Sequence, residues 1–227
     1  MLAGSLGLEP SKHLSRDETL SVLPTIESKD LRGGTIYYDG QFDDSRLALT
    51  LARTAVDHGA IVLNYMKVIA LLKENAQVNA VEVEDRETGN IHKIKGKVVI
   101  NATGIFSDEI RLLDNSQTSK IVQPSQGVHI TLDKRFLESE TAILIPHTAD
   151  GRVLFMVPWH DRVLVGTTDT PVKSPTLEPI PLDEEVDFIL KETGKYLSQH
   201  PTRGDVLSVF AGLRPLIAEE RNKKTAA

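Results

Sequence analysis

Four stretches of the chain carry the spacing or the capping signals of α-helices. The first begins at Ser15, because Ser15 and Glu18 have the spacing of a capping box, and Pro24 keeps it short. The second begins at Asp43, has apolar residues at intervals of four, and ends at Gly59. The other two predicted helices span residues 106–113 and 182–197, the latter with one apolar face.

Most other apolar residues form short runs rich in β-branched side chains, which predict strands. A polar turn at 87–90 predicts a hairpin between the strands on either side of it. The predicted strands span 33–38, 61–63, 68–72, 78–83, 91–95, 97–102, 128–132, 142–145, 153–157, 163–166 and 206–211. This order indicates an α+β fold, in which an α/β layer is joined to an antiparallel or mixed sheet.

Composition and charge exclude several classes of protein. The 227 residues form one large domain or two small ones. A net charge of −6 without any basic run argues against a nucleic-acid partner. The absence of cysteine excludes disulfides, thiolate metal sites and a cysteine nucleophile, and the histidines are too scattered for a metal site. The chain has no long apolar run and no secretory signal, so we expect a cytoplasmic protein.

One predicted strand ends in a turn that suits a cofactor. The apolar run 98–100 is followed by Asn101, Ala102, Thr103 and Gly104. A glycine in such a turn lets bare backbone approach a phosphate or a cofactor. The signal is weak by itself, because many strands end in glycine.

A second candidate lies on the predicted strand 128–132 and just before it. Gly127 and His129 face the same side of an extended chain. A histidine beside a cleft can act as a general base, since its ordinary pKa is near 6.5. The alternative is a packed or hydrogen-bonded strand histidine without a catalytic role.

Three further polar groups also allow an ordinary and a functional interpretation. The segment 167–169 (Thr-Thr-Asp) either orients a ligand or caps a turn. Arg214 follows an apolar strand and either binds a phosphate or carboxylate or pairs with a nearby acidic residue. Asp44 and Arg46 either touch a ligand or serve the start of the second helix.

Taken together, six segments resemble, in order, those of the FAD-dependent glycerol-3-phosphate dehydrogenase family. This family belongs to the broader group of FAD-dependent oxidases that includes D-amino-acid oxidase. Each segment is weak alone, and the six in this order are specific. They are 37–47 (YYDGQFDDSRL), 101–104 (NATG), 126–129 (QGVH), 157–159 (VPW), 166–169 (GTTD) and 212–216 (GLRPL).

The resemblance implies the oxidation of sn-glycerol 3-phosphate, a small phosphorylated polyol, to dihydroxyacetone phosphate, with hydride transfer to FAD and electrons passing to quinone. Oxygen as acceptor, an amine or amino-acid oxidase, and a non-catalytic binding module are the alternatives. The resemblance implies that residues 34–115 form part of a cofactor layer and residues 116–227 a β-rich substrate domain.

The resemblance also implies a role for each candidate residue. It assigns His129 and Arg214 to the catalytic site. It assigns contacts with the cofactor to the following residues: Asp44, Arg46, Asn101, Ala102, Thr103, Gly104 and Gly127.

The chain departs from the family in three places. Ile105 and Phe106 stand where many members have Pro-Trp, and Gln126 stands where some have Lys. The Gly-x-Gly-x-x-Gly turn that holds the FAD pyrophosphate is absent. We therefore expect residues 1–227 to be a central portion that neither holds FAD nor turns over by itself. We further expect homo-oligomers through exposed strand edges, and peripheral attachment of the full enzyme to the cytoplasmic membrane face.

Overall fold

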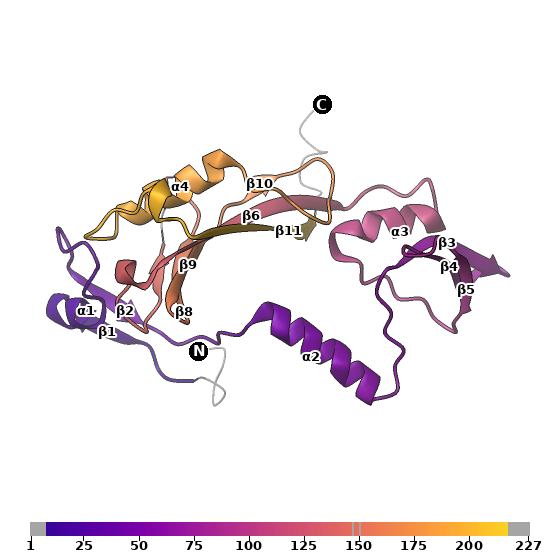
Figure 1. Ribbon diagram of the computed structural model, residues 1–227, viewed down its shortest axis with the longest axis horizontal. Coiled ribbons are helices and arrows are strands. Elements are labelled where there is room, and N and C mark those ends of the chain that lie inside the picture. The colour runs from indigo at the N-terminus through magenta and orange to yellow at the C-terminus, as the bar shows by residue number, and fades with distance from the viewer. Residues whose placement is uncertain (1–7, 147, 150, 218–227) are drawn as a thin grey trace, which may run out of the picture. The chain divides into compact units, whose positions relative to one another are not determined.

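The computed structural model describes residues 8–146, 148–149 and 151–217, so both ends of the expected portion 1–227 lie outside the described residues (Figure 1). The chain divides into two compact units. Unit 1 consists of residues 1–38 and 123–227, and unit 2 consists of residues 39–122. The helices and the antiparallel sheets of the units confirm the α+β class.

A six-stranded sheet is the centre of unit 1. Its order is β10-β6-β9-β8-β7, and β11 also pairs with β6. The pairs of β6 with β9 and β10, of β8 with β9, and of β7 with β8 are antiparallel. The strands are β6 (Val122–Asp133), β7 (Ile143–Ile145), β8 (Leu154–Trp159), β9 (Arg162–Gly166), β10 (Thr170–Pro171) and β11 (Ser208–Ile217).

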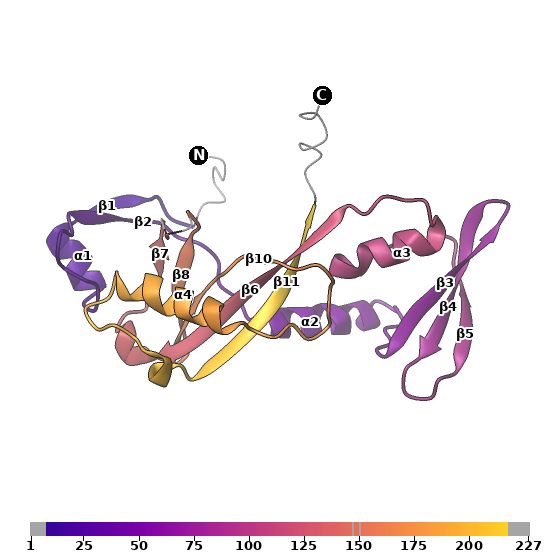
Figure 2. The same ribbon diagram turned by 90° about the horizontal axis from the view of Figure 1, so that it is seen from above.

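One face of this sheet carries the core of unit 1. Val128, Ile130 and Leu132 of β6 are fully buried, and strands β7, β8 and β9 add further apolar residues. Helix α4 (Asp183–Gly194) packs on this core through Val186, Ile189 and Leu190, as Figures 1 and 2 show for the helix and the sheet. Because side chains alternate along a strand, residues 127, 129 and 131 of β6 point away from this core.

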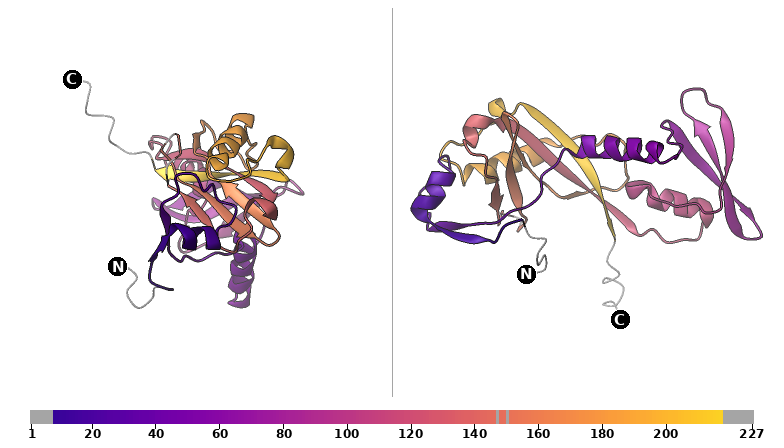
Figure 3. Two further views of the ribbon diagram at one scale, coloured as in Figure 1. Left: turned by 90° about the vertical axis from the view of Figure 1, so that its left-hand side faces the viewer. Right: turned by 90° about the horizontal axis from the view of Figure 1, so that it is seen from below.

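The N-terminal part of unit 1 confirms the predicted capping box. Ser15 is the N-cap of α1 (Arg16–Val22), its side chain accepts from the backbone of Glu18, and the Glu18 carboxylate accepts from the backbone of Ser15. Strands β1 (Lys12–Ser15) and β2 (Gly33–Ile36) pair antiparallel, with α1 beside them (Figure 3). Short 3₁₀ turns follow β6 and precede β11, at η3 (Lys134–Phe136) and η4 (Arg203–Asp205).

Unit 2 holds a separate three-stranded antiparallel sheet of β3 (Met66–Glu74), β4 (Gln77–Asp85) and β5 (Ile91–Lys95), which confirms the predicted hairpin. Its helices are α2 (Asp44–Asp57), η2 (Gly104–Phe106) and α3 (Ser107–Asp114). Asp108 of α3 is buried and accepts from Arg111 and from the backbone amides of Ile121 and Val122. This carboxylate ties α3 to the segment that follows it.

Two predicted strands are wrong. Residues 61–63 and 97–102 lie in no strand of the described chain. Their apolar side chains are largely exposed, and Ile61 is 88%, Val98 75% and Ile100 83% exposed. A β-branched run forms a strand only where another backbone pairs with it, and no described segment pairs with either run.

The bounds of the two units differ from the predicted division into residues 34–115 and 116–227. Strand β2 pairs with β1 and therefore belongs to unit 1, and α3 with the segment up to Val122 belongs to unit 2. The roles of the two predicted segments stay predictions. No helix among the described residues is long and apolar enough to cross a membrane.

Candidate functional site

His129 lies on the face of β6 that points away from the core of unit 1. Its ring is half-buried and stacks on Phe210 of β11, with ring centroids 5.3 Å apart and an angle of 9° between the planes. On β9, its cross-strand partner is Gly166. A Cβ built on Gly166 would lie 2.3 Å from Cδ2 of His129, so the imidazole fills the space that a side chain at 166 would need.

Arg214 of β11 reaches the residues that follow β9. Its Nη1 donates to the carbonyl oxygen of Thr168 at 3.0 Å, and its Nη2 donates to Oγ1 of Thr167 at 2.9 Å. Asp169 adds an ion pair at 3.5 Å. A Cβ on Gly127 would lie 2.5 Å from Nη2, so this glycine leaves room for the guanidinium.

The structure thus brings three predicted site residues together within unit 1. His129 contacts Gly166, and Arg214 contacts the next residue, Thr167, while Gly127 lies two positions before His129 on the same strand face. The guanidinium keeps N–H groups beyond its three hydrogen bonds to the described residues, and its side chain is 36% exposed. An imidazole and a partly exposed guanidinium that contact consecutive residues, Gly166 and Thr167, can take up a proton and hold an anion.

The segment 167–169 serves mainly to hold Arg214. Thr168 is buried, accepts from the backbone of Val128 at 2.9 Å, and donates to Glu185 at 2.9 Å. Asp169 accepts a hydrogen bond from Ser125. The polar groups of this segment thus bind Arg214 and other parts of unit 1. These contacts support neither of the two predicted interpretations, which are a turn cap and a direct contact with a ligand.

Glu185 and Phe210 are the site neighbours that sequence reasoning missed. Glu185 lies in the first turn of α4 and is 4% exposed. Burial alone would raise the pKa of Glu185, but hydrogen bonds from Thr170, Leu182, Gln126 and Thr168 outweigh burial and lower it below the ordinary value. In the sequence, a carboxylate in the first turn of a helix indicates only the start of that helix. The hydrogen-bond partners of Glu185 become visible only in the folded structure.

Four of the predicted cofactor residues of unit 2, residues 101–104, form a turn held by its own hydrogen bonds. Asn101 accepts from the backbone and the hydroxyl of Thr103, at 3.3 and 2.7 Å, and donates to the carbonyl of Ser107 at 3.0 Å. Gly104 has a φ of +55°, and a Cβ built there meets no atom within 4 Å. Residues 101–104 are exposed, so the turn offers open backbone.

Asp44 and Arg46 lie in the first turn of α2. The N-cap is Asp43, whose carboxylate accepts from the backbone of Arg46 at 2.9 Å. Both side chains are exposed. No hydrogen bond among the described residues connects them to the turn at 101–104, so the start of a helix accounts for their positions.

A model of the family described as FAD dependent oxidoreductase matches residues 2–223. The chain belongs to this family. The mitochondrial glycerol-3-phosphate dehydrogenase of Schizosaccharomyces pombe is 41% identical over 228 residues, covering 96% of this chain and 35% of the relative. The human mitochondrial glycerol-3-phosphate dehydrogenase is 40% identical over 233 residues, covering 99% and 32%. The chain therefore spans about a third of the length of the curated relatives it matches.

Solved structures agree with the family assignment. The glycerol-3-phosphate dehydrogenase of Bacillus halodurans, complexed with FAD, superposes with a TM-score of 0.85 at 36% identity, covering 91% of this chain and 42% of that one. The glycine oxidase of Geobacillus kaustophilus superposes with a TM-score of 0.70 at 20% identity, covering 95% and 53%. The second likeness shows the shared fold alone.

The open turn at residues 101–104 of this FAD-dependent oxidoreductase chain fits a place beside a flavin. Its backbone is exposed, and the left-handed Gly104 leaves open space where a side chain would stand. The role of these four residues, and of Asp44, Arg46 and Gly127, in cofactor binding stays a prediction. No group of three metal-ligating residues occurs in the described part of the chain.

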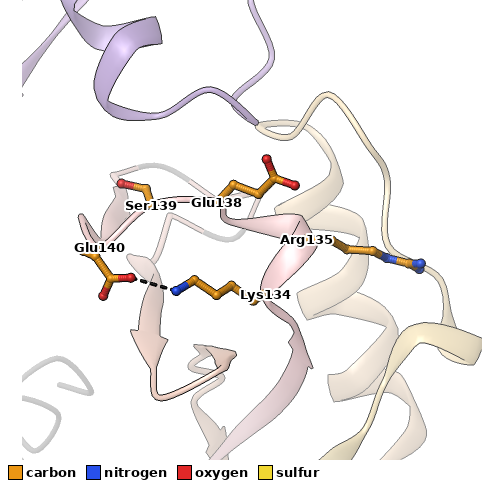
Figure 4. Close-up of a pocket in the computed structure, with 5 residues that line it drawn as sticks. All are labelled: Lys134, Arg135, Glu138, Ser139 and Glu140. Carbon is orange, nitrogen blue, oxygen red and sulfur yellow. Dashed lines mark hydrogen bonds and ion pairs between the residues drawn. The ribbon is translucent and has the colours of Figure 1, made fainter.

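A separate surface pocket of about 500 Å³ adjoins the other end of β6 (Figure 4). Three of its four charged side chains are paired, since Lys134 lies 2.8 Å from Glu140 and Arg135 lies 2.5 Å from Asp205. None of the predicted site residues lines it. We therefore place the candidate site of this oxidoreductase at His129 and Arg214. The pocket is lined by Lys134, Arg135, Glu138, Ser139 and Glu140.

Proposed function

We propose that this chain supplies the substrate-binding part of an FAD-dependent dehydrogenase that oxidises sn-glycerol 3-phosphate to dihydroxyacetone phosphate. The observation that carries the proposal is the placement of His129 and Arg214 against consecutive residues, Gly166 and Thr167. The names of relatives about 40% identical to the chain support the same substrate. In this proposal, residues 34–115 contribute to the cofactor layer and residues 116–227 to the substrate domain.

Arg214 binds the phosphate of the substrate. Its planar fork matches a phosphate with two parallel hydrogen bonds, and the residues that already hold the guanidinium fix its direction. Gly127 leaves the space in which the guanidinium lies, because any larger residue would displace it.

His129 accepts the proton of the C2 hydroxyl on a ring nitrogen. The stack on Phe210 and the contact with Gly166 hold the imidazole in one orientation, as a general base requires. A bound FAD would supply the acceptor for the hydride that leaves C2. The turn at residues 101–104, together with Asp44, Arg46 and Gly127, lies beside the cofactor in this proposal.

Two substitutions in the complete FAD-loaded dehydrogenase test the assignment. Arg214→Ala raises KM for glycerol 3-phosphate by roughly one to two orders of magnitude, because charged hydrogen bonds to the phosphate are lost. His129→Asn lowers kcat by about a hundredfold or more with a smaller change in KM. An unchanged KM in Arg214→Ala would contradict the phosphate assignment, and a loss in kcat alone would point to another role for Arg214.

We further propose quinone as the electron acceptor of the full enzyme, at the cytoplasmic face of a membrane, with the protein as a homo-oligomer. Support for a quinone comes from relatives that are named as mitochondrial dehydrogenases. Support for association comes from the exposed apolar runs of unit 2. Comparing reduction of a soluble quinone with oxygen consumption tests the acceptor, and light scattering of the purified protein tests the oligomer.

A further inference from the structure

Glu185 is a buried carboxylate whose partners among the described residues are all neutral. It is 4% exposed and accepts four hydrogen bonds. The donors are Oγ1 of Thr168 at 2.9 Å, Oγ1 of Thr170 at 2.6 Å, Nε2 of Gln126 at 2.7 Å and the backbone nitrogen of Leu182 at 3.0 Å. Burying a carboxylate costs free energy unless hydrogen bonds compensate for the lost hydration.

These hydrogen bonds favour the ionised form of Glu185. The side-chain nitrogen Nε2 of Gln126 and the backbone nitrogen of Leu182 can only donate. The hydroxyl of Thr168 accepts from the backbone of Val128 and directs its proton to Glu185. Four donors therefore converge on one acceptor-only group, and a glutamine at this position would turn its own N–H groups toward two of them.

These contacts hold the loop on which Arg214 rests. Glu185 binds the side chains of Thr168 and Thr170, the residues on either side of Asp169. The main-chain carbonyl of Thr168 accepts from Nη1 of Arg214, and the neighbouring Thr167 accepts from Nη2. The guanidinium is thus fixed by a loop that is itself fixed from α4.

We propose that Glu185 is the positioning residue for Arg214, which aims the guanidinium at the anionic end of the substrate. The proposal deepens the assignment above and rests on Arg214 as the phosphate-binding group. Glu185 itself contacts no substrate. It determines affinity for phosphate by keeping the 167–170 loop in one conformation.

The experiment compares Glu185→Gln with Glu192→Gln in the complete FAD-loaded dehydrogenase. Glu192 is a matched control, because it lies on the same helix, is 1% exposed, and binds Lys195 and the backbone of Ala149, away from Arg214. Glu185→Gln raises KM for glycerol 3-phosphate and the Kd for inorganic phosphate, measured by calorimetry, by about tenfold. Turnover of glycerol, which has no phosphate, changes little.

Both variants lower the melting temperature, so stability does not distinguish them, whereas phosphate affinity does. Equal Kd values for phosphate in Glu185→Gln and the unsubstituted protein overturn the proposal, and so does an equal loss in both variants. In the Arg214→Ala background, Glu185→Gln has no further effect on phosphate binding, and an additive effect also overturns it.

A milder variant covers the case in which Glu185→Gln does not fold. Thr170→Val keeps the shape of the side chain and removes one of the four donors. A weaker but measurable rise in the Kd for phosphate supports the proposal, and an unchanged Kd overturns it. The proposed function is tested by a different result: it is contradicted if Arg214→Ala leaves the Kd for phosphate unchanged.

Discussion

Replacing Gly166 by alanine tests whether the position of the His129 ring governs the chemical step. A Cβ on Gly166 would lie 2.3 Å from Cδ2, 2.7 Å from Cγ and 2.8 Å from Nε2 of the imidazole. Ordinary van der Waals contact begins near 3.4 Å, so the ring has to retreat by about 1 Å. The same ring is stacked on Phe210, so a retreat also disturbs this stack.

The size of this shift sets the expected loss of activity. A catalytic group displaced by about 1 Å loses roughly a hundredfold in rate. Overpacking of this kind also costs about 1–3 kcal/mol of folding stability, which leaves a well-packed unit folded. We expect kcat of Gly166→Ala to fall about a hundredfold. The change in KM is much smaller, because Arg214 rests on Thr167 and Thr168.

The assay is anaerobic rapid mixing of the complete FAD-loaded dehydrogenase with glycerol 3-phosphate, followed by the loss of the visible flavin band. Gly212→Ala is the matched control, since Gly212 lies on β11, where a Cβ meets no atom within 4 Å. Thermal unfolding shows that each variant is folded. If folded Gly166→Ala reduces its flavin at the rate of the unsubstituted protein, the argument from the position of His129 is refuted.

Two other substitutions separate substrate affinity from stability. Gly127→Ala displaces Nη2 of Arg214, which a Cβ would approach to 2.5 Å, and raises KM by about tenfold with a smaller change in kcat, as steady-state kinetics checks. Asp108→Asn lowers the free energy of unfolding by about 2 kcal/mol, measured by urea denaturation. Burial raises the pKa of Asp108, but hydrogen bonds from two backbone amides and Arg111 outweigh burial and lower it. This contribution is therefore full above the unfolded pKa of about 3.9 and is lost as the pH falls through the lower folded value, so the two proteins converge at acidic pH.

Local signals in the sequence predict the elements that are stabilised by their own residues. Ser15 and Asp43 cap the helices that their spacing predicts, since a cap and its helix lie within one turn. Most strands of the six-stranded and three-stranded sheets are predicted, because each apolar run finds a partner in the same unit, whereas β1 and the two-residue β10 contain no apolar run and are not predicted. Residues 61–63 and 97–102 have the composition of strands without a described partner, and composition alone does not reveal whether a partner exists.

The candidate site can also be predicted from the sequence only in part, because some of its contacts join distant residues. The resemblance to a known family singles out His129 and Arg214, and the alternation along β6 explains why Gly127 shares their side. Glu185 escapes prediction because its hydrogen bonds join it to residues 126, 168 and 170, which lie between 15 and 59 positions away in the sequence. Pairing over such separations is a property of the fold, and no spacing rule contains it.

The alternation of side chains along β6 also affects how this protein can evolve. Val128, Ile130 and Leu132 belong to the core, whereas Gly127 and His129 belong to the candidate site, so stability and the proposed chemistry depend on different residues of one strand. Substitutions on the outward face can change the ligand preference of the site without repacking the core. Substitutions in the core can likewise change its packing without changing the residues of the site. A strand of this kind allows new substrate preferences to arise on an unchanged scaffold.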